Sequence, residues 1–283
     1  MRMALVMVTA TLLATACSGQ DVLKKPVVYT VPGIDSVQVT RGLVYRTDGD
    51  VSLHMDVYRP PNLQKNERRP AVLFLHGGAN ISKSPAQFPA PTEWGVYQSY
   101  GRLMGASGLI GVTFNQRIGD PQDGLQKGFG DVRAAIEYVR SHAADLQVAP
   151  DRLCLAAYSA GGPLLAVGMG DPQPYIRCLV GFYAVLDIRP PISPERAPFS
   201  PIEQLKLHSD KLPPIFLARA GKDSAGLNAT IDRFVAEAAS HDVAIEFHNI
   251  RGVPHAFDIL TPSPEVRSVI ARVIAFMKAS LEQ

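Results

Sequence analysis

The chain has 283 residues, of which 46% are hydrophobic and 19% charged, and its formal net charge at pH 7 is +2. The charged fraction is below the roughly 25% typical of soluble domains, and lysine and arginine do not cluster, which argues against a nucleic-acid-binding protein. This length favours one large domain whose core needs neither a metal nor disulfides. Histidine and cysteine show no metal-ligand spacing, so we expect no metal and no cofactor.

The first residues have the pattern of an export signal. Arg2 precedes an uncharged run over residues 3–16, which is shorter than the roughly 20 residues of a membrane-spanning helix and ends in small residues. The stretch "LATAC" resembles the lipobox of bacterial lipoproteins, whose cysteine is acylated. We therefore expect a signal peptide over residues 1–16, lipidation at Cys17 and a tether over residues 17–36. The mature protein would be a membrane-anchored lipoprotein facing the periplasm or cell surface. The alternative is an ordinary signal peptide and a periplasmic or secreted protein.

Two cysteines remain beyond this segment, Cys154 and Cys178. Export permits a disulfide, but both residues lie in or beside apolar runs, where cysteine packs as a small hydrophobe. The sequence therefore predicts two buried free thiols.

A domain over residues 37–283 is predicted to begin with a hairpin. Residues 51–58 alternate between apolar and polar side chains, as a half-buried strand does. Asp48-Gly49 before them is a hairpin signal, which predicts residues 37–45 as the antiparallel partner. Six short apolar runs follow, at residues 71–75, 109–114, 153–157, 179–184, 215–218 and 244–250.

Helical segments lie between some of these runs. Apolar side chains recur at helical spacing over residues 132–139, 231–238 and 266–277. Asn228 is the predicted N-cap of the second helix, and Ser263, with a proline after it, begins the third. Continuous apolar strands that alternate with helices predict an α/β fold, with a mostly parallel sheet covered by helices on both faces.

Reactive side chains follow four of the predicted strands directly, at residues 76–80, 158–162, 220–228 and 251–258. In an open parallel sheet, ligands bind beyond the carboxyl ends of the strands. Strand order alone therefore predicts that these four segments meet at one edge of the sheet.

Ser159 stands between an apolar run and two glycines, in the stretch "LAAYSAGGPLL". A sharp turn from a strand into a helix lifts a serine hydroxyl above the sheet edge, and it needs small residues nearby, here Ala157 and Gly161. The helix that follows directs backbone N–H groups at developing negative charge. Pro163 falls in its first turn, where a missing donor costs little. The pattern predicts a nucleophile, with a plain tight turn as the alternative.

A serine nucleophile needs a base, and the base needs a third group that fixes its tautomer. Among seven histidines, His255 has the best position, on a loop after the last predicted strand. Asp223 also follows a strand and is the predicted acid, with Asp187 as the competing candidate. Asp258 is expected to brace the loop of His255 instead. The order Ser159, Asp223, His255 is the order found in α/β-hydrolases.

The chain from about residue 37 onward resembles an α/β-hydrolase of the esterase/lipase type, and it is most similar to bacterial carboxylesterases with an "HGG" oxyanion motif. The stretches that carry the resemblance are "LHMDVYRP", "VLFLHGG", "TFNQR", "DVRAAIEYVR", "APDRLCLAAYSAGG", "LARAGKD", "LNATIDRF" and "VPHAFD". The resemblance implies a central, mostly parallel eight-stranded sheet that begins with an antiparallel hairpin.

The resemblance also implies roles for particular residues. It implies a catalytic triad formed by Ser159, Asp223 and His255. It implies an oxyanion hole of backbone N–H groups near Gly77, Gly78 and Ala160. Ala79 stands where many members of the family have a third glycine.

The expected activity is hydrolysis of small carboxylic esters through an acyl-enzyme, with the ester as the only small-molecule partner. Trp94 and Tyr97 are candidates for a wall of the substrate pocket, and the proline-rich stretch 185–214 is expected to lie over a fairly open site. Arg117 and Asp131 are expected to pair and hold a loop. Two other functions stay open from the sequence: a non-catalytic binding protein with the same fold, and a serine peptidase.

Overall fold

The computed structural model describes residues 19–78, 89–118, 123–170, 173–188 and 193–282. The expected signal peptide and Cys17 lie outside these ranges, and so do Ala79 and Asn80. Eight strands of the described chain form one sheet, in the order β1-β2-β4-β3-β5-β6-β7-β8. Their bounds are β1 Gln38–Asp48, β2 Val51–Arg59, β3 Arg69–Leu75, β4 Ile110–Phe114, β5 Val148–Tyr158, β6 Ile176–Phe182, β7 Ile215–Ala220 and β8 Ile245–Ile250.

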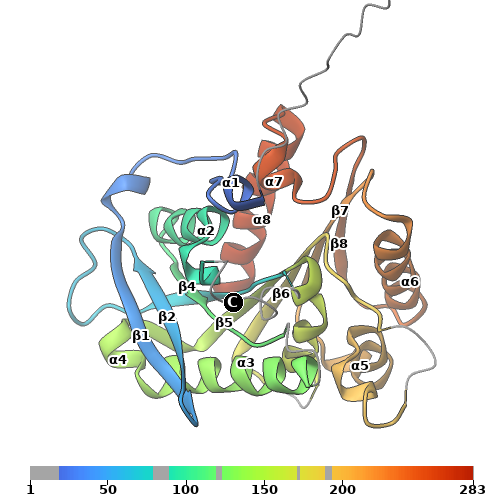
Figure 1. Ribbon diagram of the computed structural model, residues 1–283, viewed down its shortest axis with the longest axis horizontal. Helices are drawn as coiled ribbons and strands as arrows, with labels where there is room; N and C mark the ends of the chain where they lie inside the picture. The colour runs from blue at the N-terminus through green and yellow to red at the C-terminus, as the bar shows by residue number, and fades with distance from the viewer. Residues whose placement is uncertain (1–18, 79–88, 119–122, 171–172, 189–192, 283) are drawn as a thin grey trace, which may run out of the picture.

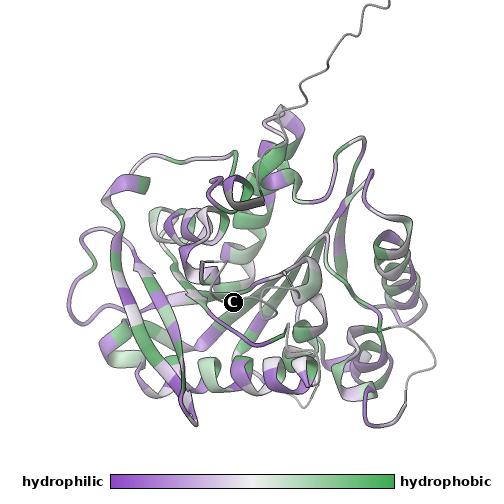
Figure 2. Cartoon of the chain, in the orientation of Figure 1, coloured by the Kyte–Doolittle hydropathy of each residue, from purple (hydrophilic) through white to green (hydrophobic). Residues whose placement is uncertain are grey.

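The sheet is mixed at one end and parallel elsewhere. The strands β1 and β2 pair in antiparallel fashion, and β2 is also antiparallel to β4. All pairs from β4 through β8 are parallel. Figure 2 shows hydrophilic and hydrophobic bands following one another along β1 and β2, as expected for strands with one solvated face. The predicted hairpin and the six predicted strands are all present, so the α/β architecture expected from the sequence is confirmed.

Helices cover both faces of the sheet (Figure 1). One face packs against α2 and α8, and the other packs against α3, η4, α5 and α6. Because successive side chains of a strand point to opposite faces, Leu73 of β3 enters one core cluster while Val72 and Phe74 enter the other. The bounds of the α-helices are α1 Gly19–Leu23, α2 Gly95–Ala106, α3 Gly124–Ser141, α4 Ala143–Leu146, α5 Pro201–His208, α6 Ala225–Ser240, α7 Phe257–Leu260 and α8 Pro264–Glu282. The 3₁₀ helices are η1 Ile34–Ser36, η3 Pro91–Glu93, η4 Ser159–Gly168, η5 Ala197–Phe199 and η6 Ser209–Lys211.

The segment before β1 packs on the domain and is not a free tether over residues 19–36. Val27 is buried, and side chains around it pack against the α2/α8 core. The N–H of Val28 donates to the carbonyl of Asp258, and Arg267 of α8 donates to the carbonyl of Val28. The sequence did not predict this packing, because the contacts of residues 19–36 follow no regular spacing and their partners lie far along the chain.

Cys154 and Cys178 form a disulfide, which corrects the prediction of free thiols. The two residues face each other in the register of β5 and β6, with their Cα atoms 4.7 Å apart. That separation lies within the range that a disulfide spans. Apolar sequence around each cysteine predicts burial correctly, but it contains no information about strand register, which decides whether the sulfurs meet.

Two details of the helices differ from expectation. Ser224, not Asn228, caps α6, because the Ser224 hydroxyl accepts from the N–H of Leu227. Asn228 lies inside the helix and donates to the carbonyl of Ala220. At the start of α8 the expected cap is present, since the Ser263 hydroxyl accepts from the N–H of Val266. The segment after Ser159 is a 3₁₀ helix, with Pro163 inside it.

Candidate active site

Ser159 lies at a sharp turn between β5 and η4. Its backbone has φ +52°, a left-handed conformation that costs energy for any residue with a Cβ. The turn needs glycine at position 161, because a Cβ there would come within 2.6 Å of the carbonyl oxygens of Leu75 and His76. Ala157, two residues before the serine, is completely buried. The small residues around Ser159 therefore let β5, η4 and the end of β3 approach closely while the serine stands at the sheet edge.

His255 and Asp223 meet Ser159 at this edge. The ring of His255 lies between them, with Nε2 at 2.9 Å from the Ser159 Oγ and Nδ1 at 2.5 Å from an oxygen of Asp223. A carboxylate accepts a hydrogen bond, so Nδ1 carries the proton and Nε2 accepts from the serine hydroxyl. The three segments after β5, β7 and β8 thus converge, as strand order predicts.

The side chains of His255 and Asp223 differ in their exposure to solvent. The His255 side chain is 40% exposed, whereas that of Asp223 is 5% exposed. The other oxygen of Asp223 accepts from the N–H of Ser224 at 2.7 Å, which fixes the carboxylate. The imidazole is therefore accessible to solvent and small molecules, while the acid behind it is held in place.

Asp187, the competing acid, has a different partner. Its side chain accepts from Nε of Arg233 at 2.7 Å, on the outer helix α6. The carboxylate that contacts His255 is that of Asp223, as the sequence analysis favoured.

The "HGG" turn after β3 lies against the serine turn. His76 is buried, and its Nδ1 donates to the carbonyl of Gly77 while its Nε2 accepts from the N–H of Gln116. Burial lowers the pKa of His76 from 6.5 to about 4, so the ring is neutral at physiological pH. The side-chain amide of Gln116 in turn donates to the carbonyl of His76. These bonds fix the turn, and Gln116 is a contributor that sequence reasoning did not single out.

The expected oxyanion donors differ in what they contact. The N–H of Gly77 donates to the Tyr97 hydroxyl at 2.9 Å, so it is not a free donor in this structure. Gly78 is exposed, with φ +84°. Ala160 lies in the first turn of η4, where backbone N–H groups have no acceptor within the helix. Gly78 and Ala160 therefore remain as the candidate donors among the residues that were expected.

Trp94 and Tyr97 pack against this turn, and their role as a wall of the substrate pocket stays a prediction. Their side chains are buried and their rings stack 5.8 Å apart. The indole N–H of Trp94 donates to the carbonyl of Pro89. Both rings lie 6.3 Å from the His76 ring, centroid to centroid, so they help to hold the "HGG" turn.

The predicted pair of Arg117 and Asp131 is present. Arg117 donates to Asp131 through its guanidinium and through its backbone N–H, and these contacts raise the pKa of the guanidinium. Arg46 of β1 pairs with the same buried carboxylate. Phe199, from the proline-rich stretch, lines a hollow of about 660 Å³ beside this network.

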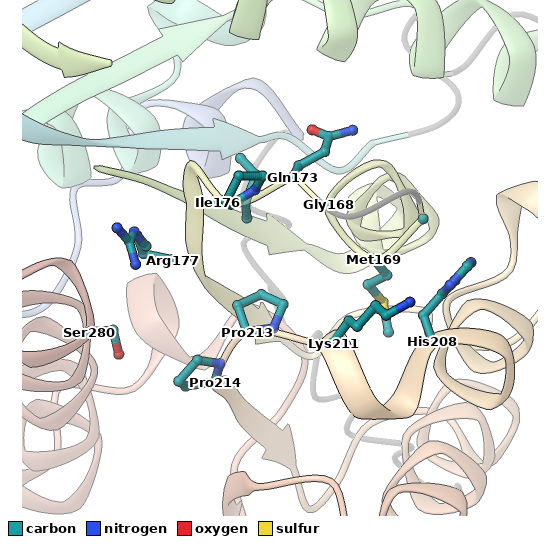
Figure 3. Close-up of a pocket in the computed structure, with 12 residues that line it drawn as sticks. Gly168, Met169, Gln173, Ile176, Arg177, His208, Lys211, Pro213, Pro214 and Ser280 are labelled. Atoms are coloured by element: carbon teal, nitrogen blue, oxygen red, sulfur yellow. The ribbon is translucent and has the colours of Figure 1, made fainter. Parts of the chain in front are cut away.

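Another pocket lies at the opposite edge of the sheet, where β6 and β7 begin (Figure 3). Its volume is about 400 Å³, and its lining includes Arg177, His208 and Lys211. Figure 3 shows Lys211 beside His208, whereas Arg177 lies apart, beyond Pro213. This pocket does not belong to the site at the carboxyl ends of the strands.

Within the ranges that the structure describes, no group of three or more histidine, cysteine or acidic side chains is arranged to hold a metal ion. None of the helices in the same ranges has the length and apolar character to cross a membrane.

Comparisons with known proteins agree on the fold. Residues 55–171 match the family model BD-FAE, an α/β-hydrolase family. Thermogutta terrifontis esterase 2, phosphoramylated by tabun, superposes with a TM-score of 0.68 at 21% identity, covering 87% of this chain and 96% of that one. A butyrate-bound structure of the Thermogutta esterase has a TM-score of 0.66 at 20% sequence identity, and the match covers 87% of this chain and 96% of that one. A mutant of esterase rPPE has a TM-score of 0.68 at 19% sequence identity, and the match covers 89% of this chain and 86% of that one. No curated protein sequence matches the chain. The chain has the α/β-hydrolase fold.

Proposed function

We propose that the protein is a serine esterase that hydrolyses small carboxylic esters. Ser159 is the nucleophile, His255 the general base, and Asp223 the acid that orients the base. The observation that carries this proposal is the continuous relay of hydrogen bonds from Asp223 through His255 to Ser159. A base within about 3 Å of the hydroxyl is close enough to take its proton. That the similar solved structures are esterases supports the same activity.

The reaction proceeds by acyl transfer in two halves. In the first half, His255 takes the Ser159 proton while Oγ bonds to the ester carbonyl carbon, and the alcohol then leaves with that proton. In the second half, a water gives a proton to His255 and its oxygen adds to the acyl carbon. The Ser159 oxygen leaves and recovers the proton, which releases the carboxylic acid. Asp223 stabilises the imidazolium in both halves.

The negative charge on the carbonyl oxygen needs donors at the moment when it forms. Ala160 and Gly78 supply backbone N–H groups beside the nucleophile in this proposal. One such donor contributes about 3–4 kcal/mol to the transition state in measured enzymes.

The proposed substrates are esters with short acyl chains. The Thermogutta esterase has been solved with butyrate and with propionate bound, and these are the acids that short-chain esters release. In this chain the His255 side chain is 40% exposed, which supports access for small esters.

Turnover of p-nitrophenyl acetate tests the proposal. We expect the wild-type protein to hydrolyse this ester, and Ser159→Ala to reduce turnover to the rate without enzyme. Ser268→Ala, which changes an exposed serine on α8, is the matched control and should retain full activity. Paraoxon, which phosphorylates the Thermogutta esterase, should add one phosphoryl group to wild type and to Ser268→Ala but not to Ser159→Ala.

Other outcomes favour the rival functions. Equal turnover by wild type and Ser159→Ala would indicate a binding protein that uses the fold without catalysis. A panel of acyl esters from acetyl to decanoyl, run beside peptide substrates, would identify a peptidase if peptides were cleaved and esters were not.

We also propose that the protein is exported and anchored by a lipid on Cys17. The support is the sequence pattern of residues 1–17 together with the disulfide between Cys154 and Cys178, a bond typical of oxidising compartments.

A further inference from the structure

The ring of Tyr183 packs against the ring of His255. It is the first residue after β6, and the centroids of the two rings lie 4.6 Å apart at an angle of 57°. The two nitrogens of His255 are held by Asp223 and Ser159, but these bonds leave the tilt of the ring to its packing. Tyr183 is therefore placed to set the tilt of the base.

The hydroxyl of Tyr183 is anchored in turn to α7, the short helix that follows His255. It donates to one oxygen of Asp258 at 2.8 Å, and Tyr100 of α2 donates to the other oxygen at 2.9 Å. Asp258 is completely buried and lies three residues after His255. Burial raises the pKa of the Asp258 carboxyl, and the two tyrosine hydroxyls lower it. A buried carboxyl with both oxygens satisfied is a rigid anchor, because losing either donor leaves an unpaired polar atom.

The backbone of Tyr183 supports the same conclusion. Its φ is +39°, in the left-handed region that a residue with a bulky side chain rarely adopts. The strained position is held by a hydrogen bond from its N–H to the carbonyl of Ala218 at 2.7 Å. Ser159 and Ala256 also have positive φ, so strained residues occur on three segments around the site. Strain of this kind costs about 1–3 kcal/mol per residue and persists where the surrounding structure fixes it.

We propose that Tyr183 is a positioning residue for His255: its ring fixes the tilt of the imidazole, and its hydroxyl, held by Asp258, fixes the ring. This inference rests on the proposed esterase function. Tyr183 touches neither the ester nor Ser159 in this proposal, and it acts through His255 alone. Losing the contact lets the imidazole turn away from the nucleophile, and a displacement of about 1 Å in a reacting group costs up to about 100-fold in rate.

Three variants test the proposal by kinetics. Tyr183→Leu removes the ring and the hydroxyl and should lower kcat by about 100-fold, with KM changed less than threefold. Tyr183→Phe keeps the ring and should recover activity to within about tenfold of wild type. Tyr45→Phe is the control, since Tyr45 is a buried tyrosine that donates to the carbonyl of Asn115, away from His255. The kcat of Tyr45→Phe should equal that of the wild type. Equal kcat in Tyr183→Leu and Tyr45→Phe overturns the proposal.

A second measurement separates this inference from the esterase proposal. The proton on Nδ1 of His255, shared with Asp223, should give a far-downfield proton NMR resonance, identified by its loss in His255→Gln. That resonance should weaken or broaden in Tyr183→Leu and stay unchanged in Tyr45→Phe, whether or not esters are turned over. An unchanged resonance in Tyr183→Leu overturns the positioning role. A wild-type protein that hydrolyses no ester overturns the esterase proposal and leaves the NMR comparison to decide the role of Tyr183.

Discussion

Two aspartates follow neighbouring strands of the sheet, and their partners distinguish them. Asp223 contacts His255, whereas Asp187 pairs with Arg233. We expect Asp223→Asn to lower kcat for p-nitrophenyl acetate by about 10³- to 10⁴-fold, because the amide favours the wrong tautomer of the base. Asp187→Asn should keep kcat within about threefold. The Arg233 side chain is half exposed, so its guanidinium keeps water as a partner when the charge of Asp187 is removed. The opposite ranking of the two variants would reassign the acid to Asp187.

His76 gives a prediction for the pH dependence of stability. Its pKa in the folded chain is about 4, below the ordinary 6.5, so the unfolded chain takes up the proton first as the pH falls. The stability from this group is complete above pH 6.5 and is lost progressively between pH 6.5 and 4. Between pH 7.5 and 5 the loss should be about 2 kcal/mol. Urea unfolding at these two pH values measures it.

His76→Gln is the informative variant, because a glutamine side chain can still accept from the N–H of Gln116 but does not titrate. Its free energy of unfolding should fall by about 2 kcal/mol less than that of wild type over the same pH range. His142→Gln, at a surface histidine, should behave like wild type. A His76→Gln variant as pH-sensitive as wild type would show that His76 does not titrate with a lowered pKa.

The sequence predicted those site residues whose position follows from the order of the strands. Ser159, Asp223 and His255 each follow a predicted strand directly, and parallel strands bring such positions together. Tyr183 was not predicted, because its hydroxyl lies at the end of an apolar run and its partner depends on how two loops pack. The bond from Gly77 to Tyr97 was missed for the same reason.

Among the elements, β5 and β6 are joined by a bond that the sequence did not predict. The Cys154–Cys178 disulfide closes a loop with a sequence separation of 24 residues. Cross-linking a loop of this size restricts the unfolded chain and typically stabilises by about 3 kcal/mol. We expect Cys154→Ala/Cys178→Ala to lose about that much in urea unfolding. Two reactive thiols per molecule in denatured, unreduced protein carrying Cys17→Ser would contradict the bond.

The contact between the N-terminal segment and α2 gives a second prediction for an element. A Cβ on Gly95, the first residue of α2, would come within 2.3 Å of the carbonyl oxygen of Lys24. Backbone cannot yield as a flexible side chain can, so Gly95→Ala should displace the segment and cost about 1–3 kcal/mol. Gly226→Ala, in the first turn of α6, is the matched control, because its Cβ would meet nothing within 4 Å. It should stabilise by up to about 1 kcal/mol. Thermal unfolding that ranks both variants alike would contradict this packing.

Apolar runs and helical stripes predicted the strands and the long helices of this chain, because each of these elements buries a face whose period is visible in the sequence. The segment over residues 19–36 has no such period, and its burial arises from separate contacts with α2, α7 and α8. The 3₁₀ geometry of η4 was also not predicted. The close approach of Gly161, within η4, to the end of β3 was missed as well, because it is a property of the assembled sheet.

For the whole molecule, topology gives the sheet two edges with different chemistry. The carboxyl ends of β3 and β5 to β8 carry the "HGG" turn, Ser159, Tyr183, Asp223 and His255. The opposite edge, where the same strands begin, holds the pocket beside Arg177 and Lys211. Because a parallel sheet directs all these carboxyl ends the same way, the position of the candidate site could be predicted before any side-chain contact was known.

The last prediction concerns where the molecule resides. Residues 19–36 pack beside α7 and α8. A lipid on Cys17 would be attached two residues before the start of α1. Cells that express the full chain and receive a labelled fatty acid should yield a labelled protein in the membrane fraction. Cys17→Ser should be unlabelled and found in the soluble fraction, while Cys154→Ala/Cys178→Ala, which keeps Cys17, should be labelled like wild type. An unlabelled wild-type protein that has lost its first residues would indicate an ordinary signal peptide. One that keeps them would rule out export by this segment.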